Sequence, residues 1–137
     1  MSKNFYNGSV FGKTVEVSFV DGTRVLYPSA QMPINPETGN IIPYQGGGAI
    51  GSAKHQTKQC LENLKKGLET LDYSIKHVVR ARVMIDIDYY KDIFSDVSKI
   101  CNLYLPNCAL SFFAGKNPTD IPGPEVLVQI EVDVVRR

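Results

Sequence analysis

The chain has 137 residues, 43% of them apolar and 21% charged, and its 15 basic and 14 acidic side chains leave a formal net charge of +1. These proportions are typical of a globular protein with a buried core, and the near-neutral balance excludes a global field that would steer nucleic acid or anionic membranes. Because the sequence has neither the apolar core of a signal peptide nor a run of ~20 apolar residues, we expect a cytoplasmic protein with a single domain over residues 1–137 and no membrane or nucleic-acid partner.

The first part of the chain predicts a pair of strands. Residues 1–13 are polar, contain glycine and follow no period, so they form an irregular arm or a short edge strand. Apolar and polar residues then alternate over 15–19, which predicts a half-buried strand. The Asp-Gly pair at 21–22 is typical of a two-residue hairpin turn, and residues 23–29 form the returning strand.

The stretch 29–40, Ser-Ala-Gln-Met-Pro-Ile-Asn-Pro-Glu-Thr-Gly-Asn, is a loop that cannot become a helix. Pro33 and Pro36 fix φ at about −65°, lack N–H donors and favour extended geometry in the residue before them. Gly39 can supply a positive φ where a turn closes. The triple glycine at 46–48 lacks the frame of a phosphate-binding loop, so a flexible entry to the next helix is favoured over a phosphate cradle.

A helix is predicted over residues 53–70, with Ser52 as its N-cap. Its buried face follows the three- and four-residue spacing of an amphipathic helix and carries Thr57, Cys60, Leu61, Leu64, Leu68 and Leu71. Lysines and glutamates mix on the other face. Because the glutamates are interspersed, a solvated face is favoured over an RNA-binding patch.

A strand, a helix and two further strands follow. A strand over 77–87 has Val79, Ala81, Val83, Ile85 and Ile87 on one face. A second helix over 89–104 has the buried stripe Tyr90, Ile93, Val97, Ile100 and Cys101. A short strand over 108–113 and a loop over 114–124 lead to the last strand, 125–135, where valines and Ile130 alternate with polar residues.

The order of elements, ββαβαββ, predicts an α+β domain with a mixed sheet and both helices packed on one face. The opposite sheet face carries a mixture of polar and apolar side chains: Arg80, Arg82, Met84, Leu127, Gln129, Glu131 and Asp133. A half-apolar face that no helix covers is a candidate subunit interface.

Two stretches carry a resemblance to a known family. The loop 29–40 resembles the signature loop of the RidA/YjgF family of small trimeric enamine/imine deaminases, Ser-Gly-Gln-Ile-Pro-hydrophobic-Asx-Pro-Glu/Lys-Thr-Gly, and departs from it by more than a conservative change only at Ala30. The segment 56–65, Gln-Thr-Lys-Gln-Cys-Leu-Glu-Asn-Leu-Lys, is similar to the first helix of that family. The resemblance extends over about residues 14–136.

The resemblance implies a chorismate mutase-like homotrimer with small-molecule clefts between its subunits and with neither cofactor nor metal. In this family an arginine after the second helix binds the substrate carboxylate, and a glutamate on the last strand positions the attacking water. The glutamate corresponds to Glu131 here. The implied ligand-binding positions are Ala30, Phe94, Cys108 and Leu110.

Three of these positions depart from the family pattern. Cys108 occupies the position of the arginine, which removes five N–H donors and a charge and costs ~1.5–3 kcal/mol of affinity for an anionic ligand. Ala30 and Phe94 make the cleft tighter and more apolar. A divergent member with weak or no activity on 2-imino acids is therefore favoured. The alternative is an active deaminase of a less anionic substrate, acting through Glu131 and water, so the sequence leaves open whether the protein is an enzyme.

The remaining cysteines and histidines suggest no further chemistry. Three cysteines without CxxC spacing favour a reduced protein without disulfides or a zinc site. Cys108 can be an inert buried thiol, a thiol activated by a nearby cation, or the mark of a cleft rebuilt for a neutral ligand. His55 and His77 are expected to be surface or structural residues. Without a basic stripe or an acid/base histidine pair, the ribonuclease activity long attached to the family is disfavoured.

Overall fold

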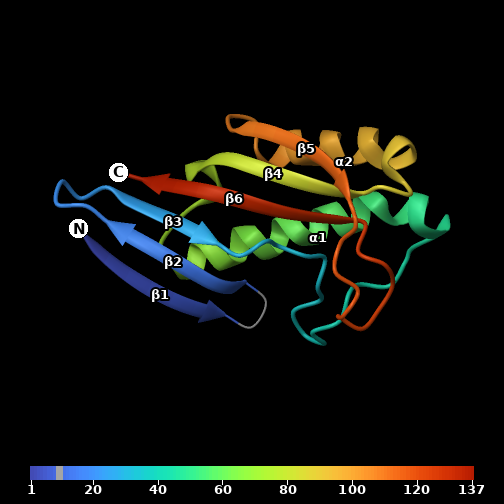
Figure 1. The fold of residues 1–137 in the computed structure, drawn as a ribbon, viewed down its shortest axis with the longest axis horizontal. Helices are drawn as coiled ribbons and strands as arrows, with labels where there is room; N and C mark the ends of the chain where they lie inside the picture. The colour runs from blue at the N-terminus through green and yellow to red at the C-terminus, as the bar shows by residue number, and fades with distance from the viewer. Residues whose placement is uncertain (9–10) are drawn as a thin grey trace.

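The computed structural model describes residues 1–8 and 11–137 and contains a six-stranded sheet with strand order β1-β2-β3-β6-β4-β5. Its elements are β1 (Ser2–Gly8), β2 (Gly12–Ser18), β3 (Arg24–Pro28), α1 (Gly48–Thr70), the 3₁₀ helix η1 (Ile75–His77), β4 (Val78–Asp86), α2 (Tyr90–Tyr104), β5 (Ala109–Gly115) and β6 (Val128–Arg136). The two long helices lie on the same side of the sheet (Figure 1). The predicted α+β class and one-sided helix packing are confirmed.

The sheet is mixed because one of its connections is a crossover that contains a helix. β4 and β5 are parallel and joined through α2, whereas β1 with β2, β2 with β3, β3 with β6, and β4 with β6 are antiparallel. Of the two alternatives for residues 1–13, the edge strand is correct for 2–8, while residues 9–10 lie outside the described part of the chain.

The predicted two-residue hairpin is wrong, because five residues, 19–23, connect β2 and β3. Strand pairing ends at Ser18 and Arg24. Within the connection, the Asp21 side chain accepts a hydrogen bond from the backbone N–H of Thr23 at 2.9 Å. Gly22 has φ 91°, a left-handed conformation that favours glycine. The Asp-Gly pair therefore forms part of a longer turn.

The start of α1 also differs from the prediction. The helix begins at Gly48, and Gly47, with φ 93°, is its N-cap. Ser52 lies inside the helix, fully buried, and its hydroxyl accepts from the N–H of Gln45 at 2.7 Å. Ser52 therefore holds the preceding loop against the helix and does not cap it. The predicted buried face is confirmed from Thr57 to Leu68.

Three side chains at or just beyond the ends of the central strands differ from their predicted burial. A β-bulge between Val78 and Arg80 turns Val79 into solvent, and Val78 fills the core position. Leu127 was expected on the exposed face of the sheet but is fully buried. Ile87, expected beside Ile85, lies beyond the end of β4 and is exposed. The alternation itself holds from Ala81 to Ile85.

The core lies between the helices and one face of the sheet. It is built from Leu61, Leu64 and Leu68 of α1, Ile93 and Val97 of α2, and the buried positions of β3, β4 and β6. The opposite face, here termed the uncovered face, carries Val15, Val17, Val25, Tyr27, Arg82, Met84, Phe113, Gln129, Glu131, Asp133 and Val135. Its mixed character was predicted and is retained.

Candidate functional site

The loop that follows β3 is tied to β6, and this brings Ala30 beside Glu131. The N–H of Gln31 donates to the carbonyl oxygen of Ile130 at 2.6 Å, and the N–H of Ile130 donates back to the carbonyl of Gln31 at 2.9 Å. The side-chain amide of Gln31, which is buried, also donates to the carbonyl of Ser29. The backbone at Ala30 is therefore fixed against the last strand.

Two buried polar residues of α1 hold the loops at this end of the molecule. The Asn63 amide donates to the carbonyl oxygens of Met32 at 3.3 Å and Ile34 at 2.8 Å. Gln56 donates to the carbonyl of Glu125 and accepts from the N–H of Leu127, both at 2.8 Å. The loop after β3 and the loop before β6 thus share one helix as their support.

The same two loops also contact each other. They lie side by side at one end of the sheet (Figure 1), where the N–H of Ile41 donates to the carbonyl of Pro122 at 2.9 Å. Because each loop is held both by α1 and by the other loop, the edge of the site that carries Ala30 is built on fixed backbone.

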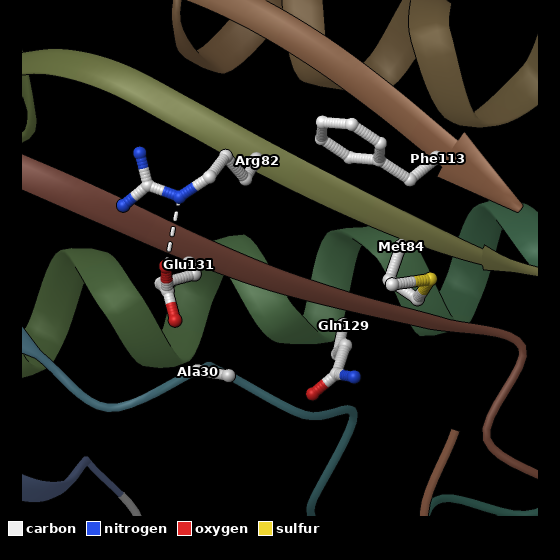
Figure 2. Close-up of a pocket in the computed structure, with 6 residues that line it drawn as sticks. All are labelled: Ala30, Arg82, Met84, Phe113, Gln129 and Glu131. Atoms are coloured by element: carbon white, nitrogen blue, oxygen red, sulfur yellow. Dashed lines mark hydrogen bonds and ion pairs between the residues drawn. The ribbon is translucent and has the colours of Figure 1, made fainter. Parts of the chain in front are cut away.

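A hollow of about 340 Å³ opens on the uncovered face next to Ala30. It is lined by Ala30, Arg82 and Met84 of β4, Phe113 of β5, and Gln129 and Glu131 of β6 (Figure 2). Three strands and one loop therefore contribute to it. Its walls are mostly apolar, with the polar groups gathered at the end that carries Glu131.

An ion-pair cluster forms that polar end. The Arg82 Nε donates to Glu131 Oε1 at 2.8 Å, and its two terminal nitrogens donate to the two oxygens of Asp133 at 3.2 and 2.9 Å. These bonds, with that to Asp133 contributing most, raise the pKa of Arg82 above its usual range. About half of the Glu131 side chain stays exposed at the hollow.

The other predicted ligand residues lie on the opposite side of β5. Leu110 and Cys108 pack towards the core, and Phe94 of α2 stacks on Tyr90 and meets the ring of Phe112 edge-on at 5.2 Å. One protomer therefore brings Ala30 and Glu131 together and separates both from Phe94, Cys108 and Leu110.

Cys108 lies in the connection between α2 and β5, half-buried in a second hollow of about 270 Å³. Burial raises the pKa of the Cys108 thiol, so the protonated form dominates at neutral pH. This disfavours the activated-thiol interpretation. All three cysteines are free.

The two histidines occupy positions that agree with a structural or surface role. The Nδ1 of His77 accepts from the backbone N–H of Ser74 at 2.9 Å in the capping box of η1. Burial, helped by nearby cations, lowers the pKa of His77. His55 is exposed near the start of α1.

Four residues that line the site, Arg82, Met84, Phe113 and Gln129, were not predicted from the sequence as ligand-binding positions. Arg82 is the cross-strand partner of Glu131, and this pairing is the signal that could have identified it. The pairing depends on the register between β4 and β6, which the bulge at Val79 shifts. Alternation alone therefore placed Arg82 on the correct face of the sheet but could not identify Glu131 as its cross-strand partner.

Comparisons with known proteins identify the family of this chain. The profile of the family described as "Endoribonuclease L-PSP" matches residues 15–135. A RutC family protein of Pyrococcus horikoshii is 31% identical over 112 residues, which cover 77% of this chain and 75% of that protein. Another RutC family protein, from Pyrococcus abyssi, is 35% identical over 79 residues, which cover 58% of this chain and 52% of that protein.

Solved structures share the fold. The Rid family protein YyfA of Yersinia pestis superposes with a TM-score of 0.72 at 22% identity, covering 97% of this chain and 98% of that one. Escherichia coli TdcF, solved with bound serine, has a TM-score of 0.63 at 21% identity and covers 89% of this chain and 86% of that one. Within residues 1–8 and 11–137, the structure contains no helix with the length and apolar character needed to cross a membrane.

Proposed function

This chain belongs to the endoribonuclease L-PSP family, the RidA/YjgF proteins, and from that premise we propose that it is a homotrimer that binds a small molecule in clefts between its subunits. In this proposal the protein has weak or no activity on standard 2-imino acids. Two features carry this proposal together. Glu131 is retained at the hollow, and position 108, where the family has its carboxylate-binding arginine, is a cysteine.

The uncovered face supports the trimer. It combines valines, Tyr27 and Phe113 with an ion-pair cluster, and about half of the Tyr27 and Phe113 side chains is exposed in one protomer. A face of this composition gains stability when a second protein surface covers it. Contact between copies of this face would enclose the hollow beside Glu131.

The cleft then contains groups from two subunits. In this proposal one subunit contributes Ala30 and Glu131, and its neighbour contributes Phe94 of α2 with Cys108 and Leu110 at the start of the edge strand β5. The E. coli protein TdcF carries bound serine, which agrees with a small-molecule role for the family. For this chain the loss of the arginine argues against the same class of anionic ligand.

Two measurements test this proposal. Light scattering on the purified protein should give three times the protomer mass, and a monomer would contradict the interface. For activity, an amino-acid oxidase generates 2-imino acids in a coupled assay, and we expect little acceleration of their hydrolysis by the wild type. Fast hydrolysis that Glu131→Gln abolishes would contradict the divergent site and show that the cleft works without the arginine.

The Cys108→Arg variant sharpens the same assay. If the cleft is otherwise intact, the new guanidinium restores a bidentate contact to the substrate carboxylate, and we expect about a tenfold gain in imine hydrolysis. Cys108→Met is the matched control, since it adds volume without charge. No gain in Cys108→Arg over Cys108→Met would mean that other parts of the cleft have also diverged.

A second candidate function is deamination of a less anionic imine, with Glu131 positioning the attacking water. The exposed half of the Glu131 side chain at the hollow favours it. A ketimine of a simple amine, hydrolysed by the wild type and not by Glu131→Gln, would establish this activity. Equal rates in the two proteins would exclude Glu131 from the reaction.

A further inference from the structure

The guanidinium of Arg82 has its donors turned away from the hollow. Arg82 uses its Nε for Glu131 and both terminal nitrogens for Asp133. Figure 2 shows these nitrogens on the far side of Glu131 from Gln129 and Met84. A ligand carboxylate in the hollow would therefore have to compete with two carboxylates that already hold this arginine.

Glu131, in contrast, presents an acceptor to the hollow. Its Oε1 is bonded to Arg82, whereas its Oε2 has no hydrogen-bond partner within the described part of the chain. In Figure 2 this second oxygen is directed away from Arg82, on the side of Ala30. The bond to Arg82 fixes the carboxylate, so Oε2 is held in place for a donor from a ligand.

The rest of the hollow adds apolar surface and an amide. Met84, Phe113 and Ala30 supply apolar walls, and Gln129 supplies a second side-chain acceptor. The ring of Phe113 can interact with a cation through its π-face. Asp133 lies outside the hollow and occupies the terminal nitrogens of Arg82, so Glu131 is the charged lining residue with an atom left for a ligand. Arg80, which precedes Arg82 on the same face, is exposed and does not line the hollow.

We propose that the ligand of this hollow is a small organic cation without a carboxylate, an ammonium or a protonated imine, whose N–H groups donate to Glu131 Oε2 and whose hydrocarbon body lies against Met84 and Phe113. The inference rests on the proposed function in taking this hollow as the ligand site. For a protonated imine the balanced reaction is R₂C=NH₂⁺ + H₂O → R₂C=O + NH₄⁺, in which water adds to the carbon, the C–N bond breaks and nitrogen leaves as ammonium.

Binding of three probes with the same branched hydrocarbon end and different charge tests the charge preference. Isobutylammonium, isobutyramide and isobutyrate are titrated into the intact oligomer at pH 7 and followed by NMR. We expect the wild type to bind isobutylammonium at least about tenfold more tightly than isobutyrate. In Glu131→Gln, the affinity for isobutylammonium should fall by about tenfold and the difference between the two probes should nearly vanish. Glu69→Gln, the same charge change on the exposed face of α1, should leave both affinities unchanged.

Other outcomes overturn the inference. Isobutyrate binding as tightly as isobutylammonium, or binding of the cation that survives Glu131→Gln, would contradict it. If Glu131→Gln also abolished hydrolysis of an imine in that case, the proposed ligand site would stand and only the charge preference would fall. If neither probe bound at concentrations on the order of 10 mM and no imine were hydrolysed, the inference and the ligand site would fall together.

Discussion

Glu16 of β2 is a buried carboxylate on the helix-covered face of the sheet. It is 4% exposed and accepts hydrogen bonds from the hydroxyl of Tyr73 at 2.5 Å, the hydroxyl of Tyr6 at 3.2 Å and the amide of Asn4 at 3.4 Å. A terminal nitrogen of Arg24 lies 3.7 Å from Oε2 of Glu16, and the Arg24 guanidinium stacks over the Tyr73 ring. A buried carboxylate with this set of partners is stabilised in its charged form.

The balance of these effects sets how stability depends on pH. Burial alone would raise the pKa of Glu16, but the hydrogen bonds from Tyr73, Asn4 and Tyr6 and the charge of Arg24 outweigh it, so this pKa is lowered. A lowered pKa in the folded state contributes stability that is complete above the unfolded value of about 4.3 and disappears as pH falls through the folded value.

Tyr73→Phe should therefore be most costly near neutral pH. Removing the hydroxyl takes a donor from a buried charge, and we expect a loss of about 1–3 kcal/mol in the free energy of unfolding at pH 7. The difference from the wild type should shrink as pH falls from 5 to about 3. Urea unfolding at several pH values measures both effects.

A matched control exists for this change. Tyr104→Phe removes a hydroxyl that donates to the half-buried Glu62 at 2.6 Å, so its cost should be smaller. A Tyr73→Phe penalty no larger than that of Tyr104→Phe, or one independent of pH, would contradict the role assigned to Glu16.

The sequence placed Glu131 on the uncovered face, where it lies, but gave no sign that Glu16 is buried. Alternation over 15–19 was correctly predicted, but the side that the helices cover carries Glu16, while Val15 and Val17 lie on the uncovered face. Alternation fixes which side chains share a face and leaves open which face is covered. When both faces are partly apolar, only the position of the helices decides.

At the scale of elements, the two stretches that resemble the family are in direct contact. Asn63, in the segment 56–65, binds the backbone of the loop 29–40 through Met32 and Ile34. Gln56, at the start of the same segment, binds the backbone before β6. One buried face of α1 therefore holds both loops that bring Ala30 to Glu131.

Asn63→Ala tests this support. The variant leaves the Ile34 carbonyl without its Asn63 donor, whereas the Met32 carbonyl still accepts from the N–H of Ile34, and we expect a loss of about 1–3 kcal/mol in unfolding free energy. Hydrogen exchange should accelerate at the amides of Gln31 and Ile130, whose mutual bonds depend on the loop position. Lys65→Ala, on the exposed side of α1, is the control.

The result separates a local role from a general one. If Asn63→Ala lowers stability but leaves exchange at Gln31 and Ile130 at the wild-type rate relative to core amides, then the loop is held by other contacts. Loss of ligand binding in Asn63→Ala without loss of the oligomer would support the positioning of Ala30 by α1.

The helices were the elements best predicted from sequence, because three- and four-residue spacing identifies a buried face over many residues. The stripe Ile93, Val97 and Cys101 of α2 is buried as predicted. The start of α1 was predicted wrongly. Ser52 is a good N-cap by residue type, and only the folded loop shows that the Ser52 hydroxyl is bonded to the N–H of Gln45. A similar limit applies to Gln56 and Asn63, where a polar residue at a buried helix position was the only signal.

At the scale of the whole molecule, the two faces of the sheet differ in what covers them. Core side chains of the helices cover one face, and no described segment of the protomer covers the other. The sequence predicted that such a face exists from β4 and β6 alone. Its extension over β2 and β3, through Val17, Val25 and Tyr27, could not be predicted, because it depends on the register that joins β3 to β6.

Tyr27→Glu tests whether this face joins protomers. About half of the Tyr27 side chain is exposed in a single protomer, so the substitution should cost the isolated fold little. In an assembled trimer, however, it would bury an unpaired carboxylate, a change that commonly costs several kcal/mol per site. We expect light scattering to report a shift from three times the protomer mass to the protomer mass, with the circular dichroism of the folded chain retained. Leu103→Glu, at a more exposed apolar position on α2, is the control and should leave the trimer intact. Dissociation by both variants, or by neither, would mean that the interface lies elsewhere.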